Sequence, residues 1–215
     1  MNKIKLREPL SSLTHMLGII LGIGGTILLL INAGHYHNKL ITLSYLIFGI
    51  TLILLYTFST VYHGINASEH TIKIFRKIDH MMIFIFIAGT YTPILLISLN
   101  SPLGNSLLIL IWLIAILGIL FKILWWNAPR WLYTLLYIGM GWIAIFTIKP
   151  LKEVLPNEAI FDLFAGGITY TIGAIIYATK WPHFKNKYFG FHELFHIFIL
   201  GGSLFHFYLI YSFVV

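Results

Sequence analysis

The sequence predicts an all-α fold, a single-domain bundle of seven transmembrane helices. Composition is the first reason, because 59% of the 215 residues are hydrophobic, only 10% are charged, and the mean hydropathy is +0.88. Soluble domains carry roughly a quarter charged residues. The second reason is the spacing of the apolar segments, since seven of them approach the ~20 residues that a helix needs to cross a bilayer. The third is an uneven distribution of Lys and Arg between the loops.

The predicted helices follow one another closely, without a linker rich in Pro, Ser or charge that would separate a second domain. They lie near residues 11–31, 41–63, 79–99, 104–124, 131–148, 160–179 and 191–213. Pro93 lies well inside the third helix and is expected to kink it. Gly18, Gly22 and Gly25 in the first helix predict a close contact with a neighbouring helix.

Seven helices place the two ends of the chain on opposite sides of the membrane, so the basic residues can be sorted by side. Eleven of the 14 fall on the side of the amino terminus: Lys3, Lys5, Arg7, Lys73, Arg76, Lys77, Lys122, Arg130, Lys180, Lys185 and Lys187. The positive-inside rule predicts a cytoplasmic amino terminus and a carboxyl terminus outside. Topology therefore explains the net charge of +7 without a nucleic-acid partner, and we expect contact with anionic membrane lipids.

A cleavable signal peptide is the alternative interpretation of the first helix. Residues 11–31 form a longer apolar segment than the usual 7–15-residue core of a signal. We therefore favour a retained transmembrane helix.

Three histidines predict a metal site inside the membrane. The chain has no cysteine, so imidazole and carboxylate are the strong metal ligands available. His63 closes the second helix, and His192 and His196 open the last one, four residues apart on one face. The topology brings all three to the same depth. Because burying ionisable groups in hydrocarbon is costly, such a cluster predicts function, here a Zn²⁺ with its fourth position left for water.

Two further polar residues lie at the same depth and suggest catalysis. Asp79 opens the third predicted helix, and Ser59 precedes His63 by one turn. Zinc lowers the pKa of its water towards 7 and polarises a carbonyl oxygen. Asp79 is expected to accept a proton from that water or to orient it, and Ser59 to donate a hydrogen bond to the water or to a developing oxyanion. The alternative is that these groups only bridge helices.

The run His192-Glu193-Leu194-Phe195-His196 also fits the H-E-x-x-H pattern of zinc metalloproteases, in which the Glu is the general base. The extended pattern requires Gly and His where this chain has Ile199 and Gly202. Glu193 also lies about 100° around the helix from His192. A protease is therefore the weaker interpretation.

Three other histidines are weighed separately. His80 is interpreted as lying beside the site rather than ligating the metal. His15 lies at the right depth to approach the site. His206 lies ten residues beyond His196, about 15 Å deeper, and is interpreted as an interhelical hydrogen-bonding residue.

Together these residues resemble the hemolysin III branch of the progestin and adipoQ receptor family. The resemblance covers nearly the whole chain and rests on ordered motifs: Ser59-Thr60-Val61-Tyr62-His63, Lys77-Ile78-Asp79-His80, Ala88-Gly89-Thr90-Tyr91-Thr92-Pro93, His192-Glu193-Leu194-Phe195-His196 and Phe205-His206-Phe207-Tyr208. It implies seven helices, a cytoplasmic amino terminus and a zinc ion near the cytoplasmic face. The implied ligands are His63, His192 and His196, with Asp79 and Ser59 beside the metal water.

The resemblance also implies classes of function. The wider superfamily is similar to alkaline ceramidases, which implies hydrolysis of a lipid amide or ester. Adiponectin receptors of the same family bind a protein hormone and have been linked to ceramidase activity, but this chain lacks their long cytoplasmic amino-terminal region. The hemolysin name implies a pore that lyses erythrocytes, yet no amphipathic pore segment is present. Usage rich in Ile, Lys and Asn is consistent with a bacterium of low genomic GC. With the seven predicted spans, we therefore expect a multi-pass protein of the bacterial cytoplasmic membrane.

We therefore predict a zinc-dependent intramembrane hydrolase of an acyl lipid, whose acyl chains enter between helices while water arrives from the cytoplasm. One alternative is a non-enzymatic sensor or lipid-homeostasis protein in which zinc is structural. The other is a cytolytic pore. No particular oligomeric state is indicated.

Overall fold

The computed structural model describes residues 6–125, 127–184, 186 and 189–215. Over these residues the chain is helical and contains no strand. Within the same residues, seven helices are long and apolar enough to cross a membrane. The all-α prediction with seven spans is therefore confirmed, and the chain is a multi-pass membrane protein.

Six of the spans consist mainly of one α-helix each, and the fifth is composite. The single helices are α1 (Pro9–Tyr36), α2 (Lys39–Gly64), α3 (Glu69–Pro93), α4 (Pro102–Leu124), α7 (Asn157–Thr179) and α8 (Phe191–Phe213). The fifth span joins α5 (Arg130–Trp142), the 3₁₀-helix η2 (Ile143–Thr147) and the short helix α6 (Ile148–Val154).

Helix α3 begins ten residues before its predicted start. The Ser68 hydroxyl accepts a hydrogen bond from the backbone N–H of Thr71, 3.3 Å away, and thereby caps the helix. Glu69 in the first turn complements the positive end of the helix dipole. Asp79 consequently lies well inside α3 instead of opening it.

Pro93 distorts the third span, as predicted. Helix α3 ends at this residue, and the chain continues as the π-helix η1 (Ile94–Ser98). Proline has no backbone N–H to donate and its ring crowds the preceding turn, so the regular hydrogen-bond pattern cannot pass through it unchanged.

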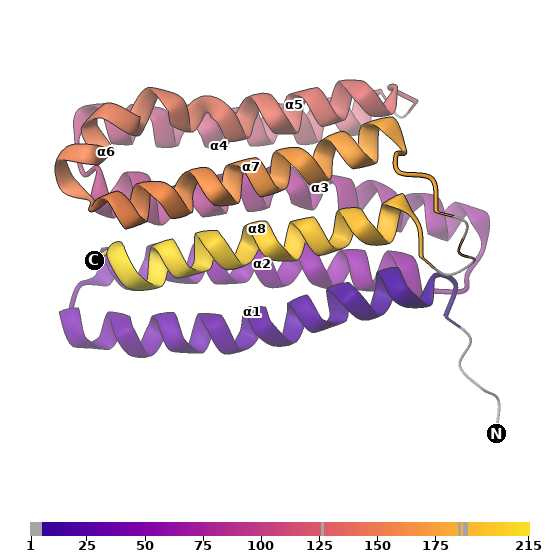
Figure 1. Cartoon of the computed structure of the whole chain (residues 1–215), viewed down its shortest axis with the longest axis horizontal. Coiled ribbons are helices and arrows are strands. Elements are labelled where there is room, and N and C mark those ends of the chain that lie inside the picture. The colour runs from indigo at the N-terminus through magenta and orange to yellow at the C-terminus, as the bar shows by residue number, and fades with distance from the viewer. Residues whose placement is uncertain (1–5, 126, 185, 187–188) are drawn as a thin grey trace.

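The helices pack side by side in chain order, and α8 returns to contact α1. Figure 1 shows the first turns of α1 and α8 and the last turn of α2 at one end of the bundle. The end of α8 lies at the opposite end from the start of α1, as an odd number of spans requires. Residues that are far apart in sequence therefore meet at one depth.

The exterior of the bundle is apolar, unlike that of a soluble protein. Large aliphatic side chains cover the outside, with Ile109 63% exposed and Leu117 62% exposed, whereas Ser44 and Thr92 are buried. In hydrocarbon only an apolar exterior is stable, and polar groups must find partners within the bundle. The predicted close packing of α1 is also observed, because a β-carbon on Gly18 would lie 2.6 Å from the Tyr56 ring of α2.

The orientation in the membrane stays a prediction. Four of the basic residues that support it, Lys3, Lys5, Lys185 and Lys187, lie outside the described residues. Arg7, Lys122 and Arg130 stand beside helix ends at the end of the bundle where α1 begins. If the positive-inside rule holds, this end faces the cytoplasm.

Candidate metal centre

His63, His192 and His196 converge where α2 ends and α8 begins. One ring nitrogen of each lies within 4.8 Å of those of the other two. The Nε2 atoms of His63 and His192 are 3.3 Å apart. The ring centroid of His196 lies 4.9 Å from that of His63 and 4.7 Å from that of His192. His63 and His196 are almost completely buried, and His192 is partly buried.

The spacing and chemistry of this cluster fit a transition-metal ion. Zinc–nitrogen bonds of about 2.0–2.1 Å at tetrahedral angles place two ligand nitrogens about 3.3 Å apart. The His63–His192 separation has this value. Three imidazoles suit zinc and its neighbours in the first transition row, whereas Mg²⁺ and Ca²⁺ prefer oxygen ligands. The predicted trio could therefore hold a metal ion.

Hydrogen bonds on the far side of two rings turn their Nε2 atoms inward. The Nδ1 atom of His196 lies 3.2 Å from the Ser11 carbonyl oxygen. A carbonyl only accepts, so Nδ1 must carry the hydrogen and Nε2 keeps its lone pair. His63 Nδ1 donates in the same way to the Glu8 carboxylate. Such partners fix the tautomer and orientation of metal-binding histidines.

Glu8 is a site residue that sequence reasoning missed. Its backbone N–H donates to the His63 carbonyl at 2.9 Å, and the Arg7 Nε atom lies 3.2 Å from its carboxylate. Burial alone would raise the pKa of Glu8, but the hydrogen bond from His63 and the charge of Arg7 hold that pKa below its usual value. The sequence did offer one signal for Glu8: it is one of only seven Asp and Glu residues in the chain, and it lies close to the start of a helix.

Ser59 and Asp79 line the same cavity as the three histidines. Ser59 is buried, one turn before His63. An Asp79 oxygen lies 3.3 Å from His80 Nδ1, which is also 2.7 Å from the Arg76 carbonyl. The structure thus places both residues in one chamber with the cluster, and their catalytic roles stay predictions.

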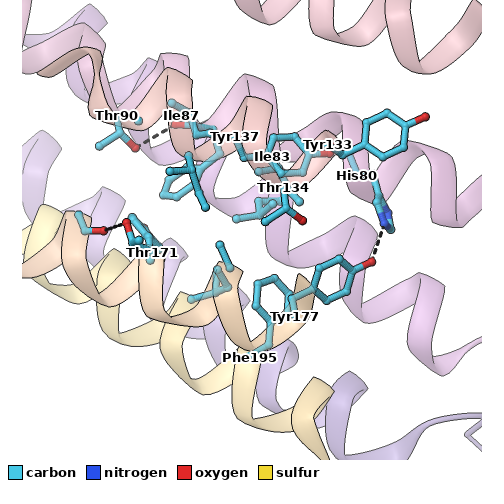
Figure 2. Close-up of a pocket in the computed structure, with 18 of the residues that line it drawn as sticks. His80, Ile83, Ile87, Thr90, Tyr133, Thr134, Tyr137, Thr171, Tyr177 and Phe195 are labelled. Carbon is cyan, nitrogen blue, oxygen red and sulfur yellow. Dashed lines mark hydrogen bonds between the residues drawn. The ribbon is translucent and has the colours of Figure 1, made fainter. Parts of the chain in front are cut away.

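His80 lies beside the cluster, in agreement with its sequence-based interpretation. Its Nε2 atom is 3.1 Å from the Tyr177 hydroxyl. Figure 2 shows His80 on α3 and Tyr177 on α7 pointing towards each other, joined by this hydrogen bond. Both nitrogens of His80 therefore have partners other than the three histidines of the cluster.

His15 joins the site by stacking. Its ring lies 3.7 Å from that of His196, centroid to centroid, with 13° between the planes. The side chain is only 4% exposed, and neither ring nitrogen has a hydrogen-bond partner among the described residues. A buried donor left unsatisfied costs about 1–3 kcal/mol, so these two nitrogens are available to a polar group that enters the chamber.

His206 corrects an expectation. It is buried, but its Nδ1 atom bonds within its own helix, to the Gly202 carbonyl at 2.9 Å. Its contact with another helix is a ring stack on Tyr170 of α7, with centroids 5.3 Å apart. A helical carbonyl four residues earlier offers an acceptor on the same face, so the bond is satisfied locally.

Glu193 is occupied as a helix cap. It accepts a hydrogen bond from the Gly190 N–H at 2.8 Å and another from the Ser11 hydroxyl at 2.6 Å. This is the Glu half of a capping box, which satisfies a free N–H at the start of α8. A side chain engaged in this way is a poor general base, which further weakens the protease interpretation.

A cavity of about 760 Å³ extends from the histidine cluster into the bundle. Its wall reaches Leu95 beyond Pro93 and Leu151 in α6, at the end of the bundle opposite the cluster. Figure 2 shows Ile83, Ile87 and Tyr137 on its wall. This volume lies within the range of small-molecule sites, and the chamber is polar near the cluster and mostly apolar beyond it.

Comparison with known proteins gives the family. Residues 4–207 match the family described as "Haemolysin-III related". "Hemolysin-3" of Bacillus cereus is 39% identical over 215 residues, which are 100% of this chain and 95% of that protein. "Hemolysin-3 homolog" of Bacillus subtilis (strain 168) is 39% identical over 91% of this chain and 89% of its own length. "Monocyte to macrophage differentiation factor" of Homo sapiens is 24% identical over 78% of this chain and 69% of its own length. With its motifs, its seven helices and this match over nearly its full length, the chain belongs to the haemolysin-III-related family.

Proposed function

We propose that this protein is a zinc-dependent intramembrane hydrolase that cleaves an amide or ester of an acyl lipid. The observation that carries the proposal is the position of the three-histidine cluster, at the polar end of a long, mostly apolar cavity. That arrangement places a Lewis-acid site against the end of a channel that suits an acyl chain.

The apolar wall supplies binding energy. Each methylene that leaves water for such a wall contributes about 0.8 kcal/mol. Residues such as Ile83, Ile87 and Leu95 offer that surface. An acyl chain lying along the cavity would place its carbonyl group near the histidines.

The chain's own residues then have distinct tasks. A bound zinc ion would supply Lewis acidity and lower the pKa of a water towards 7. Ser59 would donate a hydrogen bond to the carbonyl oxygen as negative charge develops there. Asp79 would take a proton from the attacking water and deliver it to the nitrogen or oxygen that leaves, so that one water is consumed per bond cleaved. Both side chains face the chamber that the cluster faces.

A structural role for the metal is the second candidate, and one observation favours it. His63 of α2 and His196 of α8 are each tied to the start of α1, through Glu8 and the Ser11 carbonyl. A metal shared by the histidines would therefore fasten three helices at one end of the bundle. Such a structural metal site needs neither Asp79 nor Ser59.

Product analysis on purified protein separates the two candidates. Metal content is measured by elemental analysis, and lipid products by mass spectrometry, for the wild type, His196→Ala and Asp79→Asn. The hydrolase proposal expects His196→Ala to lose metal and product, and Asp79→Asn to keep metal and lose product. Product release by His196→Ala, or wild-type protein without transition metal, would refute it. An Asp79→Asn variant that keeps full function in cells would favour the structural role of the metal.

A further inference from the structure

Three basic side chains line the cavity at the end of the bundle that holds the histidines, and because Arg76 and Arg130 are exposed there we call this end its mouth. Arg76, Lys122 and Arg130 come from α3, α4 and α5, and all three line the cavity wall beside His80 and Asn127. Lys122 lies within electrostatic reach of Arg76, and Arg76 and Arg130 both lie within reach of Tyr177. Like charges repel when gathered, so their convergence on one opening calls for an explanation.

Two of these cations are held in place by aromatic rings of the cavity wall. The Lys122 Nζ atom lies 3.5 Å from the centre of the Tyr133 ring. The Arg130 Cζ atom lies 4.6 Å from the centre of the Tyr177 ring, and its Nη1 donates to the Tyr177 carbonyl at 3.3 Å. Cation–π contacts orient a charge without neutralising it. The rings therefore position both charges and leave them able to bind an anion.

The three cations have no ion-pair partner among the described carboxylates, although Asp79 lies within electrostatic reach of Lys122. Within the described part of the chain, none of them has a carboxylate oxygen within the 4.0 Å that defines an ion pair. The acidic groups at this end of the bundle have other partners.

Each acidic side chain at this end has an identified partner. Glu8 contacts Arg7 and His63, and Glu69 lies 3.9 Å from Lys73. Asp79 contacts His80, and Glu193 caps α8. Glu8, Asp79 and Glu193 line the same cavity as the cations. Each of these carboxylates is engaged by its own partner, so none of them is paired with Arg76, Lys122 or Arg130.

We propose that Arg76, Lys122 and Arg130 form a binding site for a phosphate-type anion at the mouth of the cavity, with a phospholipid headgroup as its natural source. Guanidinium groups bind phosphate oxygens in pairs, and an ammonium adds a point charge. A cationic opening in a low-dielectric wall also concentrates anions. The lipid would place its phosphate among the three cations and its acyl chain along the apolar wall.

This inference deepens the proposed function, because it names the headgroup class of the lipid, but binding itself needs no metal. General attraction to anionic lipids is the simpler explanation of basic residues at this end. Lys73 and Lys180 separate the two explanations. Both are exposed at the same end of the bundle and neither lines the cavity, so they share the general attraction and lack the proposed site.

Binding measurements on the full chain in a neutral detergent test the proposal. The probe is a short-chain phosphatidic acid, the matched neutral probe is the diacylglycerol with the same chains, and inorganic phosphate is the competitor. The proteins are the wild type, Arg76→Gln/Arg130→Gln and the control Lys73→Gln/Lys180→Gln, which loses the same charge. Thermal unfolding and zinc content of each variant show that its fold is retained.

We expect the phosphatidic acid to bind more tightly than the diacylglycerol. Loss of the two guanidinium groups should weaken phosphatidic acid binding about tenfold or more and leave diacylglycerol binding unchanged. The control variant should differ from the wild type by about twofold or less, because its two lysines do not line the cavity. Competition by inorganic phosphate would support a site that also takes free phosphate, and its absence would support a lipid headgroup site.

Two results would overturn the proposal: equal affinity of the wild type for the two lipids, or an equal loss in the cavity and control variants. The same titration on His196→Ala keeps this outcome distinct from that of the hydrolase proposal. Binding that survives in a protein without metal or product supports the anion site even where hydrolysis fails.

Discussion

Replacing Glu8 tests whether the site depends on a residue that touches no substrate. The Glu8 carboxylate accepts the hydrogen of His63 Nδ1 and so holds Nε2 towards His192. Removing such a partner typically lowers metal affinity 10–100-fold. The Glu8 side chain is 42% exposed, and solvent screening favours the lower end of that range. We therefore expect Glu8→Ala to bind zinc about tenfold more weakly, a loss of about 1.4 kcal/mol.

Glu8→Gln should show an intermediate loss. Its amide oxygen can still accept the hydrogen bond, but the charge is gone, and charged hydrogen bonds exceed neutral ones by about 1 kcal/mol. That difference corresponds to about fivefold in affinity. Both variants keep the backbone N–H of residue 8 that donates to the His63 carbonyl, so they differ from the wild type only in the side-chain contact.

The assay is competition for zinc against a chromophoric chelator, with purified protein in detergent. Glu158→Gln serves as the control, because Glu158 is an exposed carboxylate in the first turn of α7, at the other end of the bundle. It should bind zinc as the wild type does. Wild-type affinity in Glu8→Ala would show that Glu8 does not position His63.

Three further predictions concern packing, metal removal and His15. A β-carbon on Gly89 would lie 2.1 Å from the Thr51 hydroxyl oxygen, whereas one on Gly139 would meet nothing within 4 Å. Gly89→Ala should therefore lower the free energy of unfolding by about 1–3 kcal/mol, with Gly139→Ala as its control. Equal melting temperatures for the two variants would contradict this. Removing the proposed zinc with a chelator should lower the melting temperature, because the histidines join α2 to α8 and a ligand bound only by the folded state stabilises it. Re-addition of zinc should reverse the loss. An unchanged melting temperature would contradict a metal that fastens these helices. His15→Phe keeps a ring to stack on His196 and removes both unpartnered nitrogens. Zinc content should be retained while product formation falls at least about tenfold, which is the scale of one lost hydrogen bond to a charged group. Full product formation would show that these nitrogens contact nothing in the reaction.

Local and hydrophobic features were readable from the sequence alone. The seven spans could be predicted because hydrocarbon admits only segments that satisfy their own backbone hydrogen bonds, which makes length and hydropathy decisive. The pairing of His192 with His196 followed from helical periodicity. The addition of His63 followed from topology, because consecutive spans alternate in direction and return distant residues to one end of the bundle. The start of α3 was missed, because its first turns are amphipathic and lie outside the apolar segment.

Only the tertiary structure decided what surrounds the three histidines. Glu8 is 55 positions from His63 along the chain, and Ser11 is 185 from His196, so no periodicity relates them. Their partnership depends on how α1 packs against α2 and α8, which is set by close contacts such as that of Gly18 with Tyr56. Hydrophobic patterning determines which segments enter the membrane, but many arrangements of those segments bury the same apolar area. The side-chain contacts between helices select one arrangement, and with it the ring tautomers, the cavity and the cations at its mouth.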